Sequence, residues 1–255
     1  MQQLLERLNG IGFERTRRAV AALVMSLFVS LYLALAFLLF VNGQEMWVPA
    51  FIGLAVCYGV AFMGVAAEWF WGRWFAAGLG WSGFGIAVAS MVMSGQWNPV
   101  LAVFGGMHGL VVLALAGQKM VARYDDQPTW RERYGMDEFG VARLRKTVTR
   151  TSASLPSVIL WALGPKDPGQ GMLALGLALA AGFLAIGGLR GITRLRTWGV
   201  LSLAGAAALF AAAGPHSFPH HVIAAPIRPE LALALLAAAV LPFAGPLVHH
   251  LRGRR

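Results

Sequence analysis

Long apolar runs separated by short polar stretches dominate the pattern of this chain. At a rise of about 1.5 Å per residue, most of the runs reach roughly the 30 Å of a hydrocarbon core. Trp198–Ala213, at about 24 Å, is the shortest of them. The pattern therefore predicts an all-α integral membrane protein. The seven runs are Ala19–Val41, Trp47–Ala67, Trp74–Ser94, Pro99–Gly117, Gly171–Leu189, Trp198–Ala213 and Leu231–Val248.

A shorter eighth segment, Ser152–Gly164, decides the topology of the C-terminal half. Lysine and arginine in short loops stay on the cytoplasmic side of a membrane. If the segment crosses and the N-terminus is cytoplasmic, every lysine and arginine except Lys166 and Arg228 lies inside. If it does not cross, the basic stretches "RGITRLR" and "LRGRR" both move outside. We therefore predict a polytopic bundle of about eight transmembrane helices with both termini cytoplasmic.

The composition agrees with a membrane setting. Apolar residues make up 58% of the chain and charged residues 13%, against roughly 45–50% and 25% in soluble domains. The formal charge of +10 would suggest a nucleic-acid partner in a soluble protein. Here the cations lie between apolar runs, where topology accounts for them. We expect the lipid bilayer as partner and no nucleic acid, with partner membrane subunits or a homo-oligomer left open.

We predict a single transmembrane domain over residues 1–255. Residues 1–18 are expected to form an amphipathic segment on the cytoplasmic surface. Residues 118–151 are expected to be a basic cytoplasmic loop, and residues 214–230 an extracytoplasmic loop rich in histidine and proline. The run Ala19–Val41 is interpreted as a retained span, because it exceeds the length of a signal-peptide core and no small-residue cleavage site follows it.

The predicted fifth crossing, Ser152–Gly164, supplies only about 20 Å of helix. Pro156 near its start and the stretch "GPKDPGQG" after it leave little room for extension. Short spans interrupted by proline or glycine mark substrate sites in transporters, because a broken helix leaves backbone groups facing a cavity. The alternative is a short helix packed among longer neighbours.

The lone Cys57 excludes an intramolecular disulfide and is expected to be a packing residue.

His108 and Ser82 are the candidates for chemistry inside the membrane, where an ionisable group is costly. His108 lies in "FGGMHGL", and Ser82 lies at a similar depth in "GWSG" on the preceding run. A histidine base can activate a serine hydroxyl. In these residues alone the pair resembles the dyad of rhomboid intramembrane proteases, which place the histidine two helices after the serine. The alternative is a hydrogen bond between Ser82 and His108 that joins two helices.

Three histidines, His216, His220 and His221, are candidate metal ligands, since neutral imidazoles bind copper or zinc. No cysteine or methionine accompanies them, so a structural or pH-responsive loop is the alternative. His108 is also our candidate cofactor-binding residue, as one haem ligand or a quinone contact. His108 and His249 form the nearest haem-ligand pair, and their depths are offset. The identity of any cofactor stays open.

Three functions follow from these features. The first is a non-enzymatic membrane subunit or a small channel or transporter, with its site near the short fifth span. The second is a metal- or haem-handling anchor of a redox complex that uses His108 or the three loop histidines. The third is an intramembrane hydrolase that uses Ser82 and His108. No catalytic set is complete, which favours the first function, and the alanine-, glycine- and arginine-rich composition suggests a bacterial inner membrane.

Overall fold

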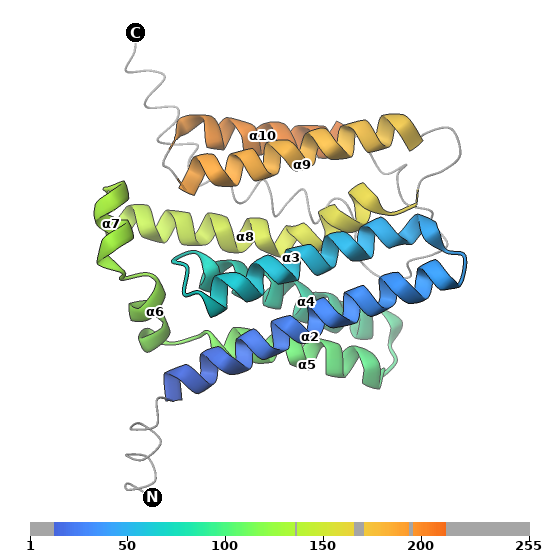
Figure 1. Ribbon diagram of the computed structural model, residues 1–255, viewed down its shortest axis with the longest axis horizontal. Coiled ribbons are helices and arrows are strands. Elements are labelled where there is room, and N and C mark those ends of the chain that lie inside the picture. Colours follow the sequence, from blue (N-terminus) through green and yellow to red (C-terminus); the bar gives the residue numbers. More distant parts are fainter. Residues whose placement is uncertain (1–12, 136, 166–170, 194–195, 213–255) are drawn as a thin grey trace, which may run out of the picture.

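The computed structural model describes residues 13–135, 137–165, 171–193 and 196–212, and all the regular structure in these ranges is helical (Figure 1). The long helices alternate in direction along the bundle. We call the end that holds the start of α2 and the helices α6 and α7 the polar end. The helices are α2 (Phe13–Val41), the short 3-10 helix η1 (Glu45–Trp47), α3 (Val48–Ala66), α4 (Gly72–Ser94), α5 (Pro99–Ala114), α6 (Gln118–Tyr124), α7 (Pro128–Tyr134), α8 (Glu138–Leu163), α9 (Gly171–Thr193) and α10 (Thr197–Ala212).

Three helical stretches among the described residues are long and apolar enough to cross a membrane: α2, η1 with α3, and α4. Helices α5 and α6 add a fourth if the pair, bent by 73°, counts as one span. The outer faces of these helices expose large apolar side chains such as Leu27, Phe37 and Val103. Soluble monomers rarely expose such extensive apolar surface. These features are those of an α-helical membrane protein. Eight crossings with cytoplasmic termini stay a prediction, because Leu231–Val248 lies outside the described residues.

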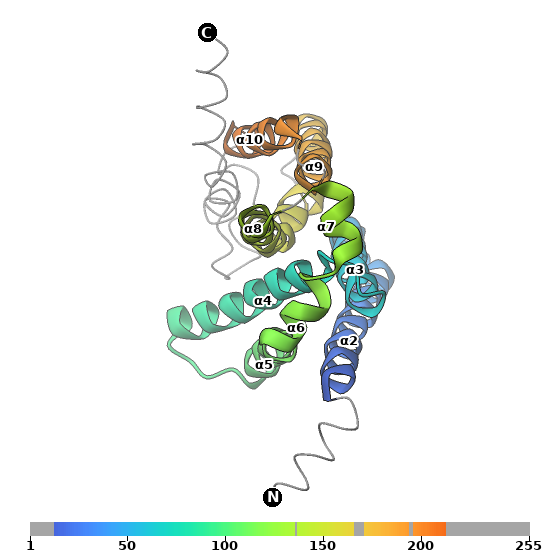
Figure 2. The same ribbon diagram turned by 90° about the vertical axis from the view of Figure 1, so that its left-hand side faces the viewer.

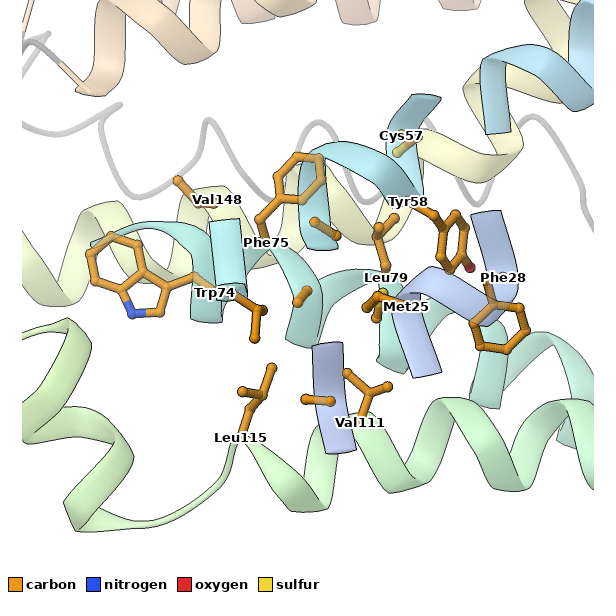
Figure 3. Close-up of a cluster of buried hydrophobic side chains, with 14 of the residues drawn as sticks. Met25, Phe28, Cys57, Tyr58, Trp74, Phe75, Leu79, Val111, Leu115 and Val148 are labelled. Atoms are coloured by element: carbon orange, nitrogen blue, oxygen red, sulfur yellow. The ribbon is translucent and has the colours of Figure 1, made fainter. Parts of the chain in front are cut away.

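The core lies among α2, α3, α4 and α5, with α8 packed on one side of it (Figure 3). Met25, Phe28, Tyr58, Trp74 and Leu79 are all buried there. The close-up shows these side chains converging from separate helices, with Trp74 near one end of the cluster and Phe28 beside Tyr58 at the other. The bundle therefore has one continuous core that runs along its length, and Cys57 is buried in it as a packing residue.

Glycines of the "GLGWSG" stretch allow α4 and α5 to lie very close together. A Cβ atom on Gly83 would collide with the imidazole of His108, and one on Gly80 would lie 2.8 Å from a methyl carbon of Val112. Gly105 of α5 makes the reciprocal contact, since its Cβ would lie 2.7 Å from that of Ala87. Small residues at helix contacts are the usual means of close approach in membranes. The stretch that suggested a serine nucleophile thus has a clear packing role.

Helix α8 corrects the expectation of a short fifth span. The helix begins at Glu138, 14 residues before Ser152, and it passes Pro156 without a break. It runs from the polar end to the opposite end, where Gly164 approaches Trp47, and Ser152 in the middle of the helix packs on Gly78 of α4 (Figure 1). Hydropathy missed its first half because that half is basic. The helix tolerates proline because the neighbouring helices and its own hydroxyl groups can compensate for one missing N–H.

Residues 118–151, which we expected to be a loop, form α6, α7 and the first half of α8. Their apolar side chains pack on the bundle: Met120, Trp130 and Leu144 are buried. Figure 2 shows α6 and α7 standing across the polar end of the long helices. This segment is therefore a folded cap on the bundle.

We expect Gly83→Ala to lower the free energy of unfolding by about 1–3 kcal/mol, because the added methyl group collides with the buried ring of His108. Gly85→Ala is the matched control on the same helix, since a Cβ there meets nothing within 4 Å. This control should be neutral or stabilising by up to about 1 kcal/mol through helix propensity. Unfolding in detergent micelles, followed by circular dichroism, measures both. Equal effects of the two substitutions would refute the close contact.

Candidate functional site

His108 lies in the centre of the bundle, fully buried, and both of its ring nitrogens are paired. Nδ1 lies 2.8 Å from the carbonyl oxygen of Phe104, and Nε2 lies 2.7 Å from the hydroxyl oxygen of Tyr58. Because a carbonyl only accepts, Nδ1 carries the proton and the hydroxyl of Tyr58 donates to Nε2. A neutral imidazole therefore has all of its polar atoms satisfied by α3 and α5.

Aromatic rings enclose this histidine. The ring centroids of Phe28 and Phe104 lie 4.0 Å and 4.3 Å from that of the imidazole, and Gly83 packs against its edge. A haem iron or a quinone could reach Nε2 only by displacing Tyr58. The surroundings thus fit a residue that holds helices together better than one that receives a ligand.

Ser82 does not take part in this pairing. The atoms of α4 that face the imidazole belong to its neighbour Gly83, and Tyr58 and Phe104 occupy both ring nitrogens. The sequence pattern did not single out Tyr58. A signal was nevertheless present, because a tyrosine in the middle of an apolar run needs a hydrogen-bond partner for its hydroxyl when it is buried.

The candidate metal ligands His216, His220 and His221 lie outside the described residues, as do His249 and the predicted loop 214–230. Within the described ranges, no group of three histidine, cysteine, aspartate or glutamate side chains is placed to hold a metal ion. The metal site at the three histidines therefore stays a prediction.

A buried ion pair joins the cap to the bundle at the polar end. Asp125 is 1% exposed, and its carboxylate accepts hydrogen bonds from Nε and Nη2 of Arg73 at 3.1 Å and 2.6 Å. Nε1 of Trp74 donates to the same carboxylate at 2.8 Å, and Arg145 of α8 lies 3.6 Å away. Asp125, which follows α6 directly, thus connects this helix with α4 and α8.

Glu68 forms a second ionic contact at this end. It occupies the turn between α3 and α4 with φ +55°, a left-handed conformation that is uncommon outside glycine. Its carboxylate pairs with Arg18 of α2 and accepts a hydrogen bond from Arg123 of α6 at 2.7 Å. Gln127 donates to its backbone oxygen at 2.8 Å. These contacts hold the turn in place, so both acidic residues have structural partners.

An apolar groove of about 660 Å³ lies between α3, α4, α8 and α9. It extends from Gly53 and Leu163 near one end of the bundle to Trp71 and Val148 near the polar end. The α8 residues that line it cover about 22 Å of helix. The lining residues are Gly53, Val56, Cys57, Val60, Trp71, Phe75, Val148, Leu155, Val158, Ile159, Leu163, Leu179, Gly182, Phe183, Ala185, Ile186 and Arg190.

The groove opens toward the surroundings of the bundle. Val56 on α3 is 61% exposed and Phe183 on α9 is 74% exposed, and both line it. Leu155, Val158 and Ile159 of the predicted fifth span form its wall on α8. A volume of this size lies within the range of roughly 300–1,000 Å³ typical of sites for small ligands. The arrangement can bind an extended apolar molecule, and it brings no catalytic set to the groove among the described residues.

Removing the buried charge should test the ionic contact at the polar end. We expect Asp125→Asn to destabilise the protein by about 3–5 kcal/mol, because Arg73 would then be buried without its counter-ion. Asp126→Asn is the control, since this neighbour is exposed and its ion pair with Arg131 contributes about 1 kcal/mol or less. Thermal unfolding in detergent measures both variants. Similar losses in the two would contradict the proposed role of Asp125.

The partner of His108 can be tested in the same assay. Tyr58→Phe should cost about 1–3 kcal/mol, because Nε2 is left buried without a donor. Ser82→Ala should change the stability by less than about 0.5 kcal/mol, since Ser82 makes no bond to the ring. A larger loss of stability in Ser82→Ala than in Tyr58→Phe would show that Ser82, rather than Tyr58, is the hydrogen-bond partner of His108.

No protein-family model, curated protein or solved structure matches this chain. Its function therefore has to follow from the groove, the paired polar groups and the apolar outer surface of the bundle.

Proposed function

We propose that this chain is a non-enzymatic membrane protein that holds the acyl chain of a bilayer lipid in the groove between α3, α4, α8 and α9. The observation that carries the proposal is the groove itself. It is long and open, its lining is almost entirely aliphatic and aromatic, and it belongs to a bundle with the features of a membrane protein.

The dimensions of the groove suit an acyl chain. The hydrocarbon of one leaflet is about half of the roughly 30 Å bilayer core, and the groove follows α8 for about 22 Å. A chain lying along it would contact Val158, Phe183 and Ile186 on both walls. Because lipid tails are as apolar as these side chains, retention depends on close packing rather than on a hydrophobic driving force.

The groove supports the first of the three functions that we derived from the sequence. The predicted fifth span contributes one wall, so a site near that span has a physical basis in Leu155 and Ile159. A bound lipid is compatible with a membrane subunit and with a small transporter, and we propose the bacterial inner membrane as its location. The hydrolase has weaker support, because the only histidine near Ser82 among the described residues is already paired. A redox anchor would have to rely on the three loop histidines.

Filling the groove should displace the lipid. Gly182 lines the groove and a Cβ there meets nothing within 4 Å, so Gly182→Leu would project its side chain into this space. We expect the lipid retained per protein to fall to roughly half or less through lost packing contacts. Native mass spectrometry of protein released from lipid nanodiscs counts the retained lipid.

Gly176→Leu is the matched control. It adds the same side chain to the same helix at an exposed glycine that has equally open space and does not line the groove. It should leave the lipid count unchanged. Equal lipid retention by Gly182→Leu, Gly176→Leu and the wild type would reject the groove as the site.

A further inference from the structure

The groove carries charge at one end. Arg190, in the last turn of α9, is the one charged residue among the described residues that line it. It lies at the end of the groove that Trp71 and Val148 also form, because α9 runs back toward the polar end (Figure 1). Away from this end, the lining residues of the groove are uncharged. The groove is therefore amphipathic along its length.

The polar end as a whole carries excess positive charge. Its three buried or partly buried acidic side chains among the described residues, Asp125, Glu68 and Glu14, already have basic partners. The exposed Lys146 of α8 and Arg196 before α10 add further cations on this side of the bundle. An anionic group at the end of the groove would thus meet a positive potential.

We infer that the occupant is an anionic phospholipid of the bilayer, with its phosphate at Arg190 and one acyl chain along the groove. This inference rests on the proposed function. Basic pockets between membrane helices on the cytoplasmic side bind anionic headgroups, and a guanidinium group keeps its positive charge and carries five N–H donors, so it can attract a phosphate in addition to another contact. Charge complementarity selects this occupant over an uncharged hydrocarbon, which would gain nothing from the positive potential.

The positions expected for the phosphate and for the acyl chain also agree with their usual depths in a bilayer. Trp69 and Trp71, whose ring centroids lie 5.1 Å apart, occupy the turn at the polar end beside the groove. Tryptophan gathers at the headgroup level of membranes. A phosphate at Arg190 would therefore lie at the level of the lipid headgroups, and the chain attached to it would extend into the hydrocarbon region, where Val158 and Phe183 line the groove.

The test places p-benzoylphenylalanine at position 183, which is exposed and lines the groove. The full chain is reconstituted in nanodiscs that contain phosphatidylglycerol and phosphatidylcholine with identical acyl chains. After irradiation, the mass of the adduct identifies the captured molecule. We expect lipid adducts that favour phosphatidylglycerol about fivefold over its share of the bilayer, the effect of one cation at the membrane surface.

Two variants of this protein show whether the preference belongs to the groove. Arg190→Gln should reduce it nearly to the bulk lipid ratio, whereas Arg196→Gln, which removes a nearby exposed charge outside the groove, should keep it. Equal losses in both variants would overturn the inference, because they would indicate general attraction to the basic surface. Unchanged unfolding temperatures of the two variants verify that the fold is intact.

The other outcomes separate the two proposals. Lipid adducts without a preference for phosphatidylglycerol overturn the headgroup assignment and leave the proposed function standing. An adduct to residues 231–248 of the same chain, or to a second copy, in place of lipid overturns both. In either of those cases the groove is a protein contact.

Discussion

The bundle depends on one constraint: a polar group that leaves water must find its partner within the chain, because hydrocarbon offers none. Asp125 meets this constraint with Arg73 and Trp74, and His108 meets it with Tyr58 and Phe104. Each set of contacts joins segments far apart in the sequence. Satisfying the buried polar groups therefore also fixes which helices are neighbours and how the cap of α6 and α7 lies on them.

Small residues determine how closely those neighbours approach. On α4, Gly78 faces α8 while Gly80 and Gly83 face α5, so the helix lies tightly between both. Helix α9 makes its closest glycine contacts with α10, through Gly188 and Gly191. It leaves open space at Gly182, where the groove lies. The groove is thus the place where close packing stops, and its walls are the apolar faces that remain without a protein neighbour among the described residues.

The contrast between closely packed helices and the open groove also separates the structural candidates from the functional ones. His108, the ionisable candidate from the sequence that lies within the described residues, is enclosed and paired, which suits a role in holding the helices together. The space that can receive a ligand is lined mostly by ordinary valine, leucine, isoleucine and phenylalanine residues. In a membrane protein such residues give no sequence signal of a site, because lipid-facing surfaces have the same composition.

The sequence by itself determined the helical membrane architecture and most helix ends. Apolar run length is a local property, and so are the stop signals: α2 and α4 end at the predicted Val41 and Ser94, and α5 begins at the predicted Pro99. The sequence also predicted a site near the fifth span, which is the region where we propose that a lipid binds. It did not reveal α8 as one long helix, because the basic first half buries only one face and hydropathy averages the two faces.

Only the tertiary structure decided which residues meet. Tyr58 and His108 are 50 positions apart, and Arg73 and Asp125 are 52 apart. No local pattern encodes pairs so far apart in the sequence, because the pairing follows from how four helices pack. The groove likewise exists because α9 pairs with α10 and, among the described residues, leaves part of α3 and α8 uncovered. The local sequence pattern determined which segments are helices. The close glycine contacts and the hydrogen bonds between buried polar groups determined how these helices pack against one another.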